Sequence, residues 1–321
     1  MSARSAVRAI GRQIATLRRR LQTSSHRSFR LTKRYKVSKA KGPITGSFRL
    51  FKAALQLIKR NYRLFLPLVA IYLIVYWLFI GFPSQEAYEN ATRTATESGN
   101  VIASIGAQIL GATQGTFLQP QAPVDQFAVT LLGLIFWLTF IWAVRHISAG
   151  NRISVREALY NSSTPLVTTL VVLAIIALQL IPASIGGLVL FYVFGSGSVS
   201  GVEAMLFAIG GFLLVVLSLY FVLHSLMALI IVTLPNMFPL ESLTNAKQLV
   251  ADRRVTLLRR LIGLAFCLSL LWVVVLLPLI IINTFIDLGP VPLVPLAIDI
   301  LSALNLPISV VYLYLLYRDL L

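Results

Sequence analysis

Acidic residues are absent from the first 85 positions of this chain, and cysteine and histidine are scarce throughout it. The single cysteine, Cys267, excludes an intrachain disulfide and any metal cluster built on several cysteines. The three histidines are far apart in the sequence, and no His-Glu-x-x-His, Gly-x-Ser-x-Gly or phosphate-binding Gly-Lys motif is present. These absences predict that the protein is not an enzyme and has no catalytic residues, no cofactor and no metal site.

Charge is sparse, whereas hydrophobic residues are abundant. Charged residues make up 12% of the 321 positions and hydrophobic residues 57%, against about 25% charged in soluble proteins. A soluble core cannot bury so much apolar surface, so lipid must solvate much of the chain. Apolar runs of about 20 residues cross membranes as helices. The sequence therefore predicts an all-α membrane protein.

The positive charge is concentrated at the start of the chain. Residues 1–63 hold 18 of the 28 Lys and Arg, and we interpret residues 1–45 as a basic cytosolic arm and linker. An acid-free segment rich in Arg and Ser is also typical of a mitochondrial presequence, so the mitochondrial inner membrane is the alternative to a bacterial plasma membrane. Nucleic-acid binding is not expected, because only Phe29 and Tyr35 could stack on bases in this arm.

Residues 46–63 have the pattern of an amphipathic helix that lies in the membrane interface. Their apolar residues recur at helical spacing and are Phe48, Phe51, Leu55, Ile58 and Tyr62. We expect this side to insert into acyl chains, and the basic residues beside it to bind anionic headgroups on the cytosolic face. The predicted lipid-binding residues are Arg49, Lys52, Lys59, Arg60 and Arg63.

Residues 64–321 are predicted to form a six-span membrane domain. The spans are expected at about 64–82, 127–144, 165–195, 202–234, 261–286 and 297–317. With both termini in the cytosol, every Lys and Arg outside the spans except Arg93 falls in a cytosolic segment, as the positive-inside rule requires. We therefore expect a multi-pass protein with both termini cytosolic.

Three features within this domain give more specific predictions. The third and fourth runs are longer than a bilayer needs, so we expect a break near Pro182 or Gly186-Gly187. The pairs Gly186-Gly187 and Gly210-Gly211 are expected to permit close helix approach. In the cytosolic loops, Ser154 and Glu157 form the sequence signature of a capping box, and Pro239 is expected to begin a helix that ends near Val250.

Three polar residues inside the predicted spans are candidates for a functional site: Gln179, His224 and Asn283. We expect His224 to be a neutral imidazole that is hydrogen-bonded to Gln179, to Asn283 or to a backbone carbonyl, and the two amides to link neighbouring helices. No acidic residue is expected inside a span, and Asp299 is interpreted as part of the region flanking an outer loop. Proton coupling through His224 is the functional alternative.

The order of these segments, together with GNRISVREAL, the long third run and FPLESLTNAKQLVADRRVTLLRRL, resembles a bacterial family of six-span membrane domains. Some members of that family are fused to glycerophosphodiester phosphodiesterases, and many stand alone. The similarity covers about residues 46–320. It implies a six-span fold for this chain, and no reaction, because the catalytic domain is absent here.

The function predicted from these features is that of a non-enzymatic membrane protein whose partners are anionic lipids. It would organise the cell envelope or assist other membrane components, through protein partners that the sequence does not identify. The alternative is a small-solute transporter or channel that uses broken third and fourth spans.

Overall fold

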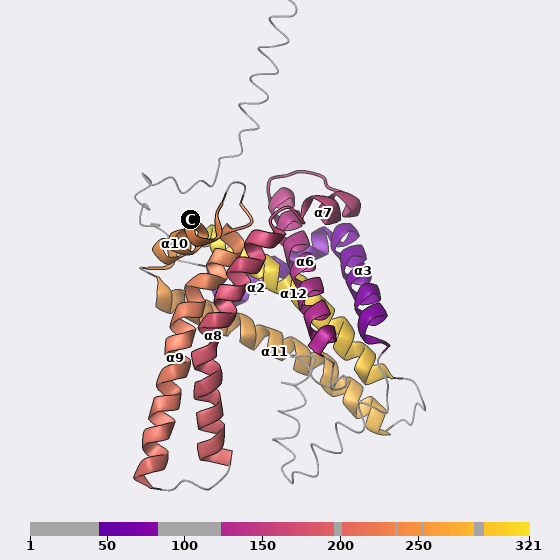
Figure 1. The fold of residues 1–321 in the computed structure, drawn as a ribbon. Helices are drawn as coiled ribbons and strands as arrows, with labels where there is room; N and C mark the ends of the chain where they lie inside the picture. Colours follow the sequence, from indigo (N-terminus) through magenta and orange to yellow (C-terminus); the bar gives the residue numbers. More distant parts are fainter. Residues whose placement is uncertain (1–44, 83–122, 196–200, 235–236, 252, 286–291) are drawn as a thin grey trace, which may run out of the picture. The chain divides into compact units, whose positions relative to one another are not determined.

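The computed structural model describes residues 45–82, 123–195, 201–234, 237–251, 253–285 and 292–321 (Figure 1). These residues form helices only. In chain order they are α2 (Ser47–Arg60), α3 (Tyr62–Ile80), α6 (Pro123–Ser148), α7 (Val155–Asn161), α8 (Leu166–Gly195), α9 (Val202–Ile231), α10 (Pro239–Val250), α11 (Arg254–Phe285) and α12 (Leu293–Leu320). Most of the predicted basic arm lies outside the described residues.

Six of these helices are long and apolar enough to cross a membrane, namely α3, α6, α8, α9, α11 and α12. The prediction of an all-α protein with six spans is therefore confirmed. Four span helices begin earlier than predicted, since α3 starts at Tyr62, α6 at Pro123, α11 at Arg254 and α12 at Leu293. The predicted bounds followed the apolar residues, whereas helical hydrogen bonding continues through the polar ends of a span.

The predicted helix over residues 46–63 is interrupted before the first span. Asn61 has φ −113° and ψ 32°, so it separates α2 from α3. Its side-chain Nδ2 donates a hydrogen bond to the carbonyl oxygen of Leu57 over 2.9 Å, which competes with the helical pattern. Arg63, predicted as part of the interfacial helix, consequently lies in the first turn of α3.

The two short helices between spans form as predicted. Ser154 caps α7, and its backbone N–H and the Glu157 carboxylate complete a capping box. Pro239 is the first residue of α10, which ends at Val250. These local signals could be read from the sequence because capping depends on residues only three or four positions apart.

Helices α8 and α9 form a long hairpin that contradicts the expected breaks. Helix α8 continues through Pro182 and Gly186, and α9 continues through Gly211. Close approach, in contrast, is confirmed at one glycine of each pair: a Cβ added to Gly186 would lie 2.5 Å from the Gly211 carbonyl oxygen. Gly187 and Gly210 face open space. Each of these two spans is therefore one continuous helix of 30 residues.

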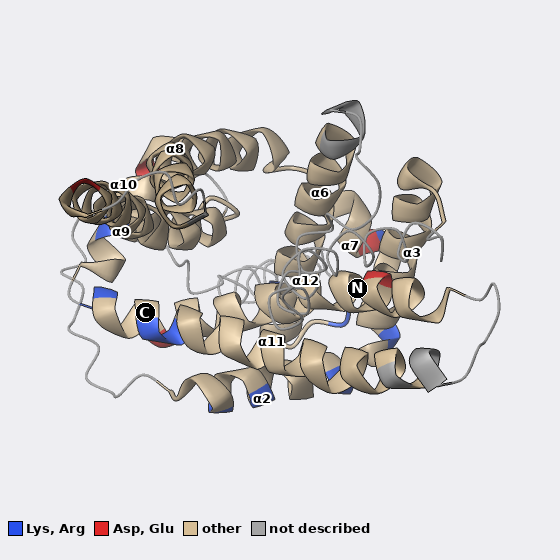
Figure 2. Ribbon diagram, turned by 90° about the horizontal axis from the view of Figure 1, so that it is seen from below, with Lys and Arg blue, Asp and Glu red and all other residues tan. Residues whose placement is uncertain are grey.

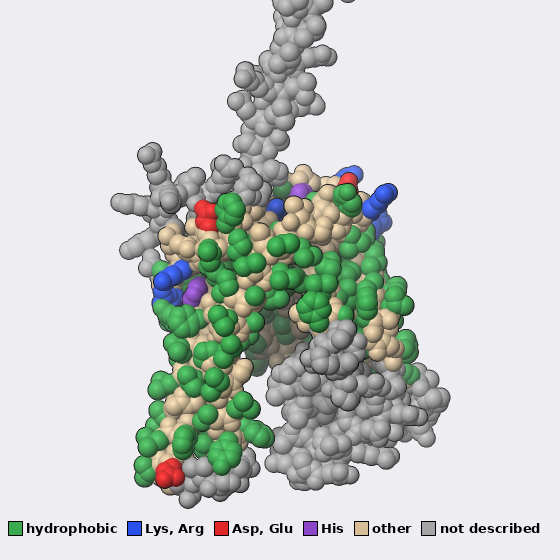
Figure 3. Space-filling model, viewed as in Figure 1, with side chains coloured by type: hydrophobic (Ala, Val, Ile, Leu, Met, Phe, Trp, Pro, Cys, Tyr) green, Lys and Arg blue, Asp and Glu red, His purple; other side chains and the backbone are tan. Residues whose placement is uncertain are grey.

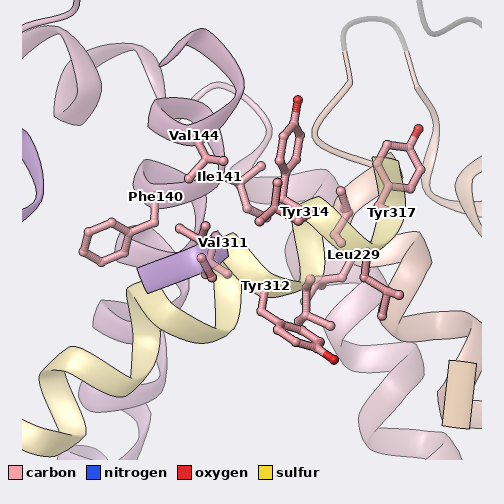
Figure 4. Packing of buried hydrophobic residues seen from close by; sticks show 14 of the residues in the cluster. Phe140, Ile141, Val144, Leu229, Val311, Tyr312, Tyr314 and Tyr317 are labelled. Atoms are coloured by element: carbon pink, nitrogen blue, oxygen red, sulfur yellow. The ribbon is translucent and has the colours of Figure 1, made fainter. Parts of the chain in front are cut away.

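Helix α12 is the most buried span, and its second half lies at the centre of the main core (Figure 4). Val311 and Tyr312 are buried there, in the same cluster as Phe140 and Ile141 of α6 and Leu229 of α9. Helices α2, α3 and α11 also pack against α12. This arrangement places α2 directly against the core of the membrane domain.

Candidate membrane-surface site

One face of α2 is buried against the protein itself. Leu50, Phe51 and Ala54 are buried, and the helix packs against α11 and α12. The prediction that the apolar side of this helix inserts into acyl chains is therefore wrong for Phe51, which neighbouring helices cover, whereas Leu55 and Ile58 are only partly buried against the same core. Phe48 was predicted to belong to the same side, but it is 70% exposed.

The beginning of α2 is held against α11 by close packing and polar contacts. A Cβ added to Gly263 would lie 2.5 Å from the Ser47 Cβ, so only glycine allows this approach. The Arg260 Nη1 donates to the Ser47 Oγ over 3.4 Å, and the Tyr312 hydroxyl donates to the Arg260 carbonyl oxygen over 2.9 Å. The orientation of α2 is thus fixed by α11 and α12.

The five residues predicted to bind lipid are all exposed: Arg49, Lys52, Lys59, Arg60 and Arg63. At 3.6 residues per turn, the four on α2 project away from the buried side of Leu50, Phe51 and Ala54, and Arg63 follows them in the first turn of α3. Within the described part of the chain, none of the five pairs with an acid. Arg63 contacts its neighbour Tyr62, since its Nε donates to the hydroxyl over 3.3 Å. Figure 2 shows Lys and Arg along α2 at the edge of the group of helices.

The other described Lys and Arg belong to the same end of the spans, where α6, α9 and α12 finish and α3, α8 and α11 begin. We call this the basic end. In the face shown in Figure 3, basic side chains gather near α7 and α10, and the hairpin of α8 and α9 carries mostly hydrophobic side chains. Glu203, in the first turn of α9, lies at the opposite end. This distribution is the one that the sequence predicted.

Of the partners predicted for His224, the structure shows the backbone carbonyl, because its ring is hydrogen-bonded to the backbone of Tyr220. Its ring lies 6.3 Å from the ring of Tyr220, one helical turn earlier, and Arg254 both donates a hydrogen bond to the Tyr220 hydroxyl and stacks over its ring. Asn283 is 29 positions beyond Arg254 in α11, about 43 Å along the helix, so it is far from His224. Its side chain lies outside the described residues. The expected pairing of His224 with either amide is not found.

Gln179 instead links α8 to α9 through two serines. Its Oε1 accepts a hydrogen bond from Ser225 Oγ over 2.7 Å, and its carbonyl oxygen accepts one from Ser218 Oγ over 2.6 Å. Both serines are buried. Gln179 and His224 therefore have separate hydrogen-bond partners, and Asn283 lies far along α11 from both, so the three candidates do not form one site.

Asp299 and Arg145 are two of the charged residues that the sequence reasoning assigned to loops or their flanks and that the structure places in span helices. Asp299 lies in the second turn of α12 and is buried, which corrects the expectation that no acid lies inside a span. The Trp77 Nε1 of α3 donates to its Oδ2 over 2.8 Å. Arg145, assigned to a loop, lies in the last turn of α6, and its Nη1 donates to the Thr233 carbonyl oxygen over 2.8 Å. Arg145 directly follows the predicted span 127–144, and Asp299 lies at the edge of the predicted span 297–317, where it was interpreted as flanking the outer loop.

The chain matches no protein-family model, no curated protein and no solved structure. In the residues that the structure describes, no group of three or more His, Cys, Asp or Glu side chains is placed to hold a metal ion. The site with the clearest chemistry is therefore the exposed cationic side of α2.

Proposed function

We propose that this protein is a non-enzymatic multi-pass membrane protein that binds anionic lipids through α2 on the cytosolic face of a bacterial plasma membrane. Through this contact it would organise the envelope or assist other membrane components. The observation that supports the proposal most directly is that one face of α2 is buried against the protein while the opposite face is exposed and basic. Leu50 and Ala54 fix α2 against the protein, and the cations on the other side are exposed.

The electrostatic contribution is large enough to select lipids. Each basic residue near an anionic surface contributes about 1 kcal/mol, and the Debye length at 0.1 M salt is about 10 Å. Several cations on one side of a short helix therefore act together only when they lie close to the headgroups. Phe48, exposed next to this side, can insert its ring among the acyl chains and bring the cations into that range.

The alternative of a transporter depended on breaks in the third and fourth spans. Both spans, α8 and α9, are continuous helices, so we do not pursue this alternative. The resemblance to the six-span bacterial family remains a prediction. It is compatible with lipid binding, but it adds no activity to the proposal.

The test uses the whole protein, because α2 in isolation would expose the side that α11 and α12 cover. Binding of a fluorescent anionic phospholipid to the protein in mild detergent is measured for the wild type and for a variant with the five cations of the α2 side replaced by Gln. The matched control replaces five other exposed cations of the basic end by Gln: Arg152, Arg156, Lys247, Arg259 and Arg318.

We expect the α2 variant to lose most of the salt-sensitive binding, and the control, with the same change in net charge, to retain it. Equal losses in the two variants would show that net charge alone attracts the lipid. Unchanged binding in the α2 variant would contradict the proposal outright. Thermal unfolding of each variant shows that the fold is retained.

A further inference from the structure

A carboxylate is buried inside the last span, at the contact between α3 and α12. Asp299 is only 3% exposed, and it lies six residues after the start of α12, about 9 Å along the helix. The Trp77 indole donates one hydrogen bond to it. Burying an ionised carboxylate costs several kcal/mol unless a cation, a set of hydrogen bonds or a proton compensates it. One indole N–H supplies only part of that compensation.

The helices packed around Asp299 offer it no basic group among their described residues. Helix α3 contributes Tyr72 and Tyr76, which interact electrostatically with the carboxylate. The described basic residues of α6, α11 and α2 are all at the basic end, and the side chain of Asp125 in α6 lies outside the described residues. The groups that face Asp299 are thus phenols and an indole, which carry no positive charge.

A line of polar side chains continues from Asp299 along α12. Ser302, Asn305 and Ser309 follow at spacings of three, three and four residues, which keeps them near one face of the helix. They are half-buried, and the amide oxygen of Asn305 is buried without a hydrogen-bond partner among the described residues. The stripe covers about 15 Å from Asp299 to Ser309, so it leads towards the basic end.

We propose that Asp299 is a proton-binding site that exchanges its proton with the basic end along the polar stripe of Ser302, Asn305 and Ser309. The proton comes from water and is returned to it, and no other reactant is needed. In the deprotonated state, Trp77 donates to the carboxylate; in the protonated state, the carboxyl group is neutral and this contact between α3 and α12 weakens. This site is independent of lipid binding by α2, and it adds a charge-switching group to a span.

The test is modification by dicyclohexylcarbodiimide, a lipid-soluble reagent, on the full-length protein in membrane vesicles. A protonated carboxyl group gives its proton to a carbodiimide nitrogen while its oxygen adds to the central carbon. The resulting O-acylisourea rearranges to a stable N-acylurea, which peptide mass spectrometry locates. We expect the adduct on Asp299 and none in Asp299→Asn. Above the midpoint of the titration, its yield should fall by about tenfold per pH unit.

The direction of proton exchange is tested in vesicles of opposite orientation. A water-soluble carbodiimide with an added amine labels whichever of Glu203 and Glu241 faces the medium, since both are exposed and they lie at opposite ends. This labelling gives the orientation of each preparation. We then expect the yield of the adduct on Asp299 to depend on the pH on the side of Glu241 and not on the pH on the side of Glu203.

Three results would overturn the proposal. They are the absence of an adduct on Asp299, a yield that does not depend on pH, and a yield that follows only the pH on the side of Glu203. The pH profile is recorded on the wild type, so it stands even if Asp299→Asn folds poorly.

Discussion

Gly186 and Gly211 bring the backbones of α8 and α9 into direct contact. A Cβ added to Gly186 would lie 2.5 Å from the Gly211 carbonyl oxygen, and one added to Gly211 would lie 2.9 Å from the Gly186 carbonyl oxygen. The obstacle in each case is backbone, which a side-chain rotation cannot move. Close packing of small residues is a main source of stability between helices in a membrane, where no hydrophobic force drives them together.

We therefore expect Gly186→Ala to separate the hairpin and to lower the free energy of unfolding by about 1–3 kcal/mol, as overpacking does elsewhere. Gly187→Ala and Gly210→Ala are matched controls, since a Cβ at either position meets nothing within 4 Å. Alanine favours a helix more than glycine, so the controls should be neutral or slightly stabilising. Unfolding in mixed detergent gives the three values. Equal stability of Gly186→Ala and its controls would contradict the packing.

The capping box of α7 should make the stability of this helix depend on pH. The Ser154 backbone N–H donates to Glu157 Oε2 over 2.9 Å, and the backbone and hydroxyl of Ser154 hold the pKa of the Glu157 carboxyl below its ordinary value of 4.5. A depressed pKa means that the cap is fully present above the ordinary value and is lost as the pH falls through the folded value. Hydrogen exchange of the α7 amides, corrected for intrinsic rates, should therefore accelerate in acid.

The matched control for this prediction is Glu157→Gln, whose amide oxygen accepts the same hydrogen bond without titrating. We expect the acid-dependent step in exchange to vanish in this variant. If the step were the same in Glu157→Gln and the wild type, another group would be its source.

Arg145 lies where three spans end, because α6, α9 and α12 all finish at the basic end. The carbonyl ends of helices carry partial negative charge, which a cation stabilises. Arg145 donates to the Thr233 carbonyl oxygen just after α9, and it interacts electrostatically with Tyr314 and Tyr317 in the last turns of α12. Its side chain thus joins the end of α6 to the chain just after α9 and lies near the last turns of α12.

Arg145→Gln should lower the free energy of unfolding by about 1.5–3 kcal/mol, the usual contribution of a hydrogen bond to a charged group. Arg145→Lys keeps the charge but loses the fork of donors, so it should fall between Gln and the wild type. The control is Arg152→Gln, at an exposed position of the same end. Thermal unfolding in detergent separates them, and equal midpoints for Arg145→Gln and Arg152→Gln would refute this role.

Local and compositional features of this fold could be predicted from the sequence, whereas contacts between helices could not. The cap at Ser154 and the start of α10 at Pro239 depend on neighbouring residues, and the number of spans depends on the length of apolar runs. The serine partners of Gln179 and the position of α2 depend on how helices pack. Lys and Arg at helical spacing predict which side of a helix is exposed. The pattern does not tell whether the opposite, apolar side contacts lipid or protein.

Asp299 illustrates how a boundary error hides a candidate site. The predicted span began only two residues before Asp299, so this residue was interpreted as flanking an outer loop, where a carboxylate is unremarkable. The observed helix begins four residues earlier and buries it against Trp77, 222 positions away in the chain. No local pattern links these two residues, because the contact exists only once α3 and α12 are packed together.

The orientation of the domain in the membrane is the last prediction, and the distribution of charge motivates it. All described Lys and Arg belong to the basic end, which should face the cytosol by the positive-inside rule. In a Cys267→Ala background, Glu203→Cys should react with a membrane-impermeant maleimide in intact cells, and Asn151→Cys only after permeabilisation, since both positions are exposed. Ala246→Cys serves as the unreactive control because Ala246 is buried in α10. Labelling of Asn151→Cys in intact cells would show that the basic end faces outward, so that α2 could bind only the outer leaflet.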